Sequence, residues 1–212
     1  MANNDEEATK KDFVEAYFEE LERKIAFLRD LEAQGHEDEA QLLALVYLDG
    51  LSNWLRHPSD GAARNFSSVV IEHGQDAQFP LIIVHWLVNA LPWKSAPSGA
   101  EHAIRQAVAA MDEYAAQTRD ELLCALRVGL TANQLSWLEA EIWRGSVANA
   151  AYVSLRSPGI HQLATHGLSF SESTWQGMVL ERVGLERLLR ALEGRWAPSG
   201  FGPPRPPPGQ RP

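Results

Sequence analysis

The sequence contains a single cysteine, Cys124, which excludes an intramolecular disulfide and any metal cluster built from several cysteines. It also lacks a long apolar run: the longest, residues 79–91, is interrupted by Pro80 and by polar residues and is too short to span a bilayer. Residues 1–11 are acidic and polar, which does not fit a secretory signal. We therefore expect a cytoplasmic protein with no membrane partner.

Patterns typical of metal and cofactor sites are missing as well. Four histidines fall in separate segments and show no ligand spacing of the His-x3-His kind: His57, His73, His85 and His102. No glycine-rich phosphate loop and no Gly-x-Ser-x-Gly elbow occurs. The sequence thus predicts no metal site and no cofactor.

The net charge of −9 would argue against a nucleic-acid partner if the charges were spread evenly along the chain, but they are not. Residues 1–40 hold 13 acidic and 5 basic side chains, whereas residues 144–212 hold 8 arginines against 4 glutamates. Arginine suits phosphate because its planar fork can donate two parallel hydrogen bonds. The segregated charge keeps RNA or a nucleotide among the candidate ligands.

Apolar residues recur at helical spacing through most of the chain, whereas strand-like alternation is rare. We expect an all-α fold, a single helical bundle over residues 8–196 with a long acidic first helix. Residues 197–212 hold 7 of the 12 prolines and are predicted to form a disordered tail. The predicted helices cover residues 10–33, 40–55, 62–73, 79–91, 101–118, 120–128, 135–155 and 180–192.

Three side chains in these helices carry specific expectations. Asp49 interrupts the apolar segment 40–55, so its carboxylate needs a partner if it is buried. Trp54 is expected in the core, and Cys124, which lies among leucines, is expected to be a packed thiol.

The segment Arg156-Ser157-Pro158-Gly159-Ile160-His161 places a fixed cation near a titratable imidazole. In an unbroken helix, positions five apart diverge by about 140°. Pro158 disfavours helix at Ser157, and Ser157 can cap a new helical turn, so a break here would let Arg156 and His161 converge. These two groups suffice for metal-free chemistry on a phosphodiester.

The run Tyr152-Val153-Ser154-Leu155-Arg156-Ser157-Pro158-Gly159-Ile160-His161 resembles the Arg-x4–6-His signature of HEPN domains (higher eukaryotes and prokaryotes nucleotide-binding). The run Leu45-Val46-Tyr47-Leu48-Asp49-Gly50-Leu51 is similar to an apolar helix with an Asp that some bacterial branches carry before that signature. Arg64-Asn65-Phe66 resembles the Arg/Phe helix that follows it there. The resemblance covers roughly residues 10–195.

The resemblance implies an all-helical homodimer whose motifs face each other, and metal-independent RNA cleavage in the active members. His161 would be the general base or acid, and Arg156 would hold the phosphate. Ser157 occupies the position at which many active members carry Asn, Asp or His. Asp49 and Arg64 are further candidate binding residues.

Three functions remain open from the sequence. The first is a ribonuclease acting as a toxin or as a stress or defence effector, with a cognate antitoxin as a further partner. The second is a non-enzymatic helical module that binds a protein partner through its acidic first helix or an exposed dimer face. The third is an RNA or nucleotide binder without turnover.

Overall fold

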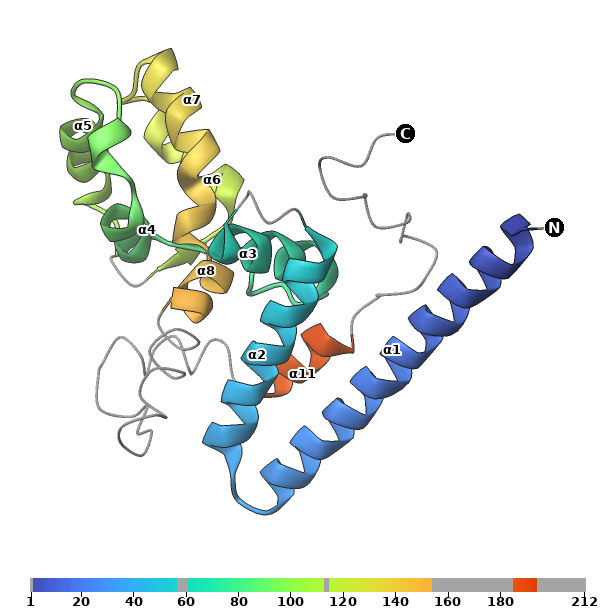
Figure 1. Cartoon of the computed structure of the whole chain (residues 1–212). Coiled ribbons are helices and arrows are strands. Elements are labelled where there is room, and N and C mark those ends of the chain that lie inside the picture. Colours follow the sequence, from blue (N-terminus) through green and yellow to red (C-terminus); the bar gives the residue numbers. More distant parts are fainter. Residues whose placement is uncertain (1, 57–60, 113–114, 154–184, 194–212) are drawn as a thin grey trace.

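The computed structural model describes residues 2–56, 61–112, 115–153 and 185–193. Helices dominate these residues, which confirms the predicted all-α fold with a long acidic first helix (Figure 1). The predicted tail at 197–212 lies outside the described residues. The elements are α1 (Ala2–Ala33), α2 (Glu37–Leu55), α3 (Ala62–His73), β1 (Ile82–Ile83), α4 (Val84–Ala90), η2 (Trp93–Ser95), α5 (Ala100–Val108), β2 (Ala116–Gln117), α6 (Arg119–Arg127), α7 (Ala132–Glu141), η3 (Ile142–Gly145), α8 (Val147–Ala151) and α11 (Leu185–Leu192).

Two apolar clusters hold these elements together. One lies among α1, α2, α3, α8 and α11, and the other among α4, α5, α6, α7 and η3. The extended segment at β1 serves both clusters: Ile83 belongs to the first, whereas Ile82 and Val84 belong to the second. Successive side chains of an extended segment point to opposite sides, so two residues of strand suffice to join the two clusters.

The predicted helix 79–91 is wrong over its first five residues. Phe79 to Leu81 are not helical, and Ile82 and Ile83 pair antiparallel with Gln117 and Ala116. β-branched residues suit an extended backbone, and Pro80 disfavours helix before it. The same pairing explains why the predicted helix 101–118 ends at Val108, ahead of β2.

The predicted helix 135–155 is also wrong as a single element, because the chain changes direction twice within it. α7 ends at Glu141, the short 3-10 helix η3 follows, and Ser146 caps the separate helix α8. A Cβ atom on Gly145 would lie 2.6 Å from Leu87 Cβ and 2.8 Å from Ile82 Cγ2, so only glycine permits this close packing of η3 on α4 and β1.

Two expected core residues lie at the surface instead. Cys124 is exposed because it falls on the outer face of α6, whose inner face carries Leu122, Leu123 and Leu126. Trp54 is 37% exposed: it lies one residue before the end of α2, and its ring stacks on Tyr17 of α1. Within the described residues, no helix has both the length and the apolar composition needed to cross a bilayer.

Candidate functional site

The three candidate catalytic residues, Arg156, Ser157 and His161, lie outside the described residues. The described chain stops at Val153, immediately before them, and resumes at Leu185. The structure therefore describes the helices that flank this segment of the chain, α8 before it and α11 after it.

Helix α8, which precedes the motif, is held in place by hydrogen bonds at its N-terminal end. The backbone N–H of Val147 donates to the Leu81 carbonyl at 2.9 Å, and that of Ala148 donates to the Phe79 carbonyl at 3.2 Å. The Asn149 side chain stabilises the turn before α8, because its Nδ2 donates to the Arg144 carbonyl at 2.6 Å. These bonds fix the position of α8 against residues 79–81.

Tyr152, at the end of α8, lies against α3. Its ring centroid is 5.2 Å from that of Phe66, and α8 packs along α3. The fold thus brings together parts of all three segments that carry the resemblance to HEPN domains, because the run 45–51 of α2, Phe66 of α3 and Tyr152 meet in the first apolar cluster.

A cluster of two arginines and a tryptophan, here called the arginine–tryptophan cluster, lies at the junction of α3 and η3. The guanidinium carbon of Arg64 is 5.8 Å from the ring centroid of Trp143, and that of Arg144 is 4.8 Å from it. Arg64 is exposed, and Arg144 Nε also pairs with Glu141 Oε2 at 2.5 Å. Guanidinium and indole groups are the side chains that hold phosphates and stack on bases.

Sequence reasoning pointed to Arg64 but missed Trp143. The dipeptide Trp143-Arg144, which immediately precedes α8 and therefore the motif, was the available signal. Its partnership with Arg64 depends on packing between residues about eighty positions apart, which no local pattern reveals.

Asp49 has different surroundings from Arg64. Its side chain is buried in α2, where Oδ1 accepts a hydrogen bond from Asn53 Nδ2 at 3.1 Å. A buried carboxylate bonded within its own helix has the environment of a structural residue. Of the two tentative binding residues, only Arg64 presents its side chain at the surface.

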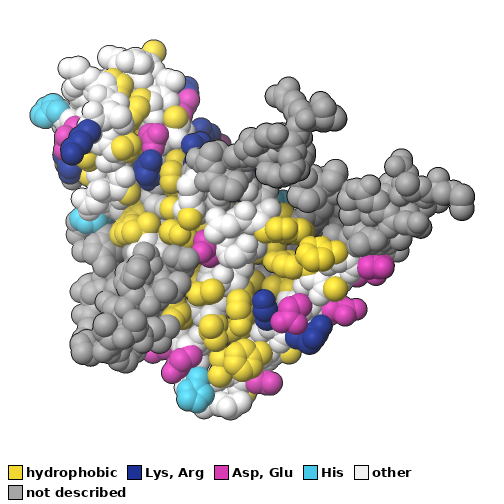
Figure 2. Space-filling view, viewed as in Figure 1, with side chains coloured by type: hydrophobic (Ala, Val, Ile, Leu, Met, Phe, Trp, Pro, Cys, Tyr) yellow, Lys and Arg dark blue, Asp and Glu magenta, His cyan; other side chains and the backbone are white. Residues whose placement is uncertain are grey.

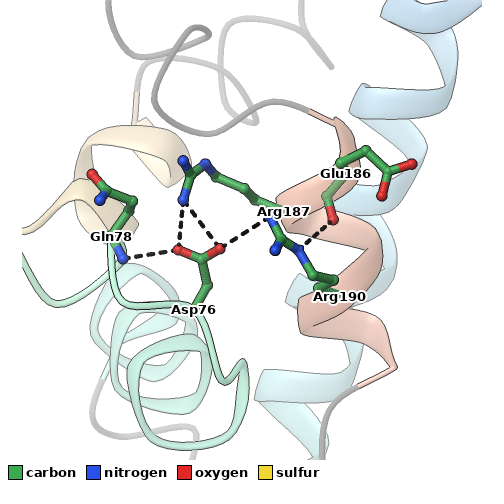
Figure 3. A network of polar contacts seen from close by, with 5 residues as sticks. All are labelled: Asp76, Gln78, Glu186, Arg187 and Arg190. Carbon is green, nitrogen blue, oxygen red and sulfur yellow. Dashed lines mark hydrogen bonds and ion pairs between the residues drawn. The ribbon is translucent and has the colours of Figure 1, made fainter.

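Helix α11, which follows the motif, is held by a network of polar contacts around Asp76, whose side chain is 4% exposed (Figure 3). Arg187 Nη1 donates to both carboxylate oxygens, at 3.0 and 3.2 Å, and Arg190 Nη2 lies 3.6 Å from Oδ2. The backbone N–H of Gln78 donates to Oδ1 at 2.8 Å. The network fastens α11 to the loop after α3, so the segment that contains the motif is anchored on α3 at one end and beside the α3 loop at the other.

An open hollow of about 540 Å³ lies beside the N-terminal end of α5. Arg105 in its wall lies over the Trp93 ring at 5.3 Å and pairs with Glu101 at 2.9 Å, so these opposite charges are matched. In the described part of the chain, no group of three or more His, Cys, Asp or Glu side chains could hold a metal ion.

The described residues therefore place an exposed arginine and a half-buried tryptophan at the junction of α3 and η3, and Tyr152 at the end of α8 contacts the same helix α3. A comparison of the chain with models of known protein families, with curated proteins and with solved structures finds no match.

Proposed function

We propose that the protein is a HEPN-like, metal-independent ribonuclease, in which Arg156 and His161 act on RNA that the arginine–tryptophan cluster helps to hold. The observation that carries the proposal is the contact between Phe66 and Tyr152. This contact puts the exposed cation of Arg64 on the same helix that receives the start of the motif.

The proposed reaction uses the ribose 2′-hydroxyl as its nucleophile. The His161 imidazole accepts the 2′-hydroxyl proton as the 2′-oxygen bonds to phosphorus. The bond from phosphorus to the 5′-oxygen breaks, and that oxygen takes a proton from the imidazolium, which leaves a 2′,3′-cyclic phosphate. Arg156 neutralises the charge that grows on the phosphoryl oxygens. We further propose a homodimer in which the two motifs face each other.

The wild-type protein is expected to cleave single-stranded RNA in a buffer that contains EDTA. The products should end in 2′,3′-cyclic phosphates, and the rate should vary between pH 6 and 8 as an imidazole titrates. A DNA oligonucleotide of the same sequence is the matched control, because it lacks the 2′-hydroxyl. RNA that stays intact at every pH in this range contradicts the enzymatic proposal.

The variant Arg64→Ala is expected to weaken RNA binding about tenfold, because one phosphate contact is lost. Binding should be measured by fluorescence anisotropy at several salt concentrations, where the slope of log K against log salt should fall by about 0.7. Arg105→Ala is the control, since Arg105 also lies over a tryptophan ring but is paired with Glu101 on α5.

The two measurements separate the remaining functions. Equal binding by Arg64→Ala and Arg105→Ala removes the cluster from the proposed RNA path. Binding that depends on Arg64 without cleavage by the wild type would indicate an RNA binder without turnover.

A further inference from the structure

The indole of Trp143 lies under two guanidinium groups. Arg64 reaches it from α3 and Arg144 follows it in η3, and their guanidinium carbons lie 5.8 and 4.8 Å from the ring centroid. Because both distances are measured to one point, the two cations cannot be farther apart than these distances taken together. Like charges repel at such a separation, and the electron-rich face of the indole offsets that repulsion. Trp143 therefore holds two cations within reach of one ligand.

The same contacts limit what else the indole can do. A base stacks on an aromatic side chain by covering its face, and a guanidinium over the ring occupies that position. Trp143 is also half-buried, so part of its surface is already packed against the protein. A base could stack on this ring only by displacing an arginine. The indole is thus a support for cations rather than a platform for bases.

The arginine–tryptophan cluster keeps a net positive charge although Glu141 lies beside it. Arg144 Nε donates to Glu141 Oε2 at 2.5 Å, and the Arg144 carbonyl accepts a bond from Asn149 Nδ2 at 2.6 Å. The carboxylate engages Nε, at the inner end of the guanidinium, which leaves the Nη groups to bind an anion. Arg64 is exposed. Two arginines against one glutamate suit a phosphate ligand.

Among the described residues, the face of the molecule shown in Figure 2 has no continuous basic surface over α5, α6 and α7. Dark blue and magenta side chains alternate there. A mixed surface of this kind can hold RNA only where cations are brought together locally, because scattered opposite charges cancel at a distance. The arginine–tryptophan cluster brings two cations together in this way.

We propose that the arginine–tryptophan cluster binds the sugar–phosphate backbone of RNA at two neighbouring phosphates, one on each arginine, with Trp143 as the positioning residue and no base stacked on it. The inference rests on the proposed function and adds the class of substrate to it: RNA is held here whatever its base sequence. Phosphate contacts position a strand but carry no sequence information.

The test measures binding to strands that cannot be cleaved. One probe is a labelled oligouridylate with methylated 2′-hydroxyls, and the other is a strand of the same length with hydrogen in place of each base. In fluorescence anisotropy, Trp143→Leu is expected to weaken the binding of both probes about tenfold, because two cation–π contacts are lost. Trp143→Phe keeps an aromatic face and should bind within about threefold of the wild type. A loss confined to the probe with bases would show that a base stacks on the indole and would overturn the proposal.

Salt dependence tests the second phosphate. Arg64→Ala combined with Arg144→Ala should lower the slope of log K against log salt by about 1.4, twice the change for one phosphate of a single strand. Neither arginine belongs to the two apolar clusters, so this variant stays informative if Trp143→Leu does not fold. A slope equal to that of Arg64→Ala alone overturns the proposal.

Trp93→Leu is the matched control, since Trp93 is also half-buried beneath an arginine, Arg105, but lies outside the cluster. It should bind both probes within about twofold of the wild type. A loss equal to that of Trp143→Leu overturns the proposal, and so does a wild type that binds neither probe. Because neither probe can be cleaved, these results do not depend on catalysis, whereas RNA that stays intact in EDTA contradicts the proposed enzyme alone.

Discussion

The variant His161→Ala is expected to lose RNA cleavage by about a thousandfold, the middle of the range that a general acid or base contributes. Without the imidazole, no group of the motif can accept the 2′-hydroxyl proton near neutral pH, since the guanidinium of Arg156 stays protonated. RNA binding should persist, because the arginines that face phosphate are unchanged. Single-turnover cleavage and anisotropy measured on the same RNA would separate the two effects.

His166→Ala is the matched control for this experiment. His166 follows His161 by five residues and carries the same side chain, but the sequence gives it no arginine at the motif spacing. Its cleavage rate should stay within about threefold of the wild type. Full activity in His161→Ala, with loss in His166→Ala, would move the general base to the second histidine and contradict the assigned role.

The variant Asp76→Ala is expected to lower the free energy of unfolding by about 2 kcal/mol. Loss of one partner from a fully buried ion pair costs about 3–5 kcal/mol, because the remaining charge is left without compensation. Here Arg187 and Arg190 are 33% and 58% exposed and can turn toward water, which reduces the cost. The Gln78 N–H, however, loses its acceptor. Urea denaturation of the full chain would measure the change.

Asp76→Asn separates charge from hydrogen bonding in this network. The amide oxygen can still accept the bond from the Gln78 N–H, but the ionic attraction to the two arginines is gone. Its destabilisation should fall between zero and that of Asp76→Ala. Unchanged stability in Asp76→Ala would show that α11 is held by its apolar face alone, through residues such as Leu188 and Leu189.

The long helices could be predicted from the sequence, whereas the breaks between them could not. α1, α2 and α3 follow apolar periodicity, and their bounds agree with the prediction at most ends. The strand at Ile82 exists because residues 116–117 pair with it, and the break at Gly145 exists because Leu87 and Ile82 press against it. Both depend on residues distant in the chain, which local periodicity does not register.

The same limit applies to the candidate site. Arg64 was named from a resemblance, but Trp143 became visible only when packing placed it beside Arg64. The pair Asp76–Arg187 joins residues 111 positions apart, and neither carries a local signal. The hydrogen bond between Asn53 and Asp49 differs, because it joins residues one helical turn apart and such a contact can be predicted from the local sequence.

The position of α11 in the chain has a consequence for synthesis. Its five buried residues cover α2, yet 129 residues separate Leu55 from Leu185. At about 5–20 residues per second, the ribosome needs roughly 6 to 26 s to make the intervening chain. During this interval the nascent protein lacks α11, so the part of the α2 surface that α11 covers stays open, while α1 and α3 can already pack on α2. The first cluster is therefore completed late, and chaperones that bind exposed apolar segments have seconds in which to act on the growing chain.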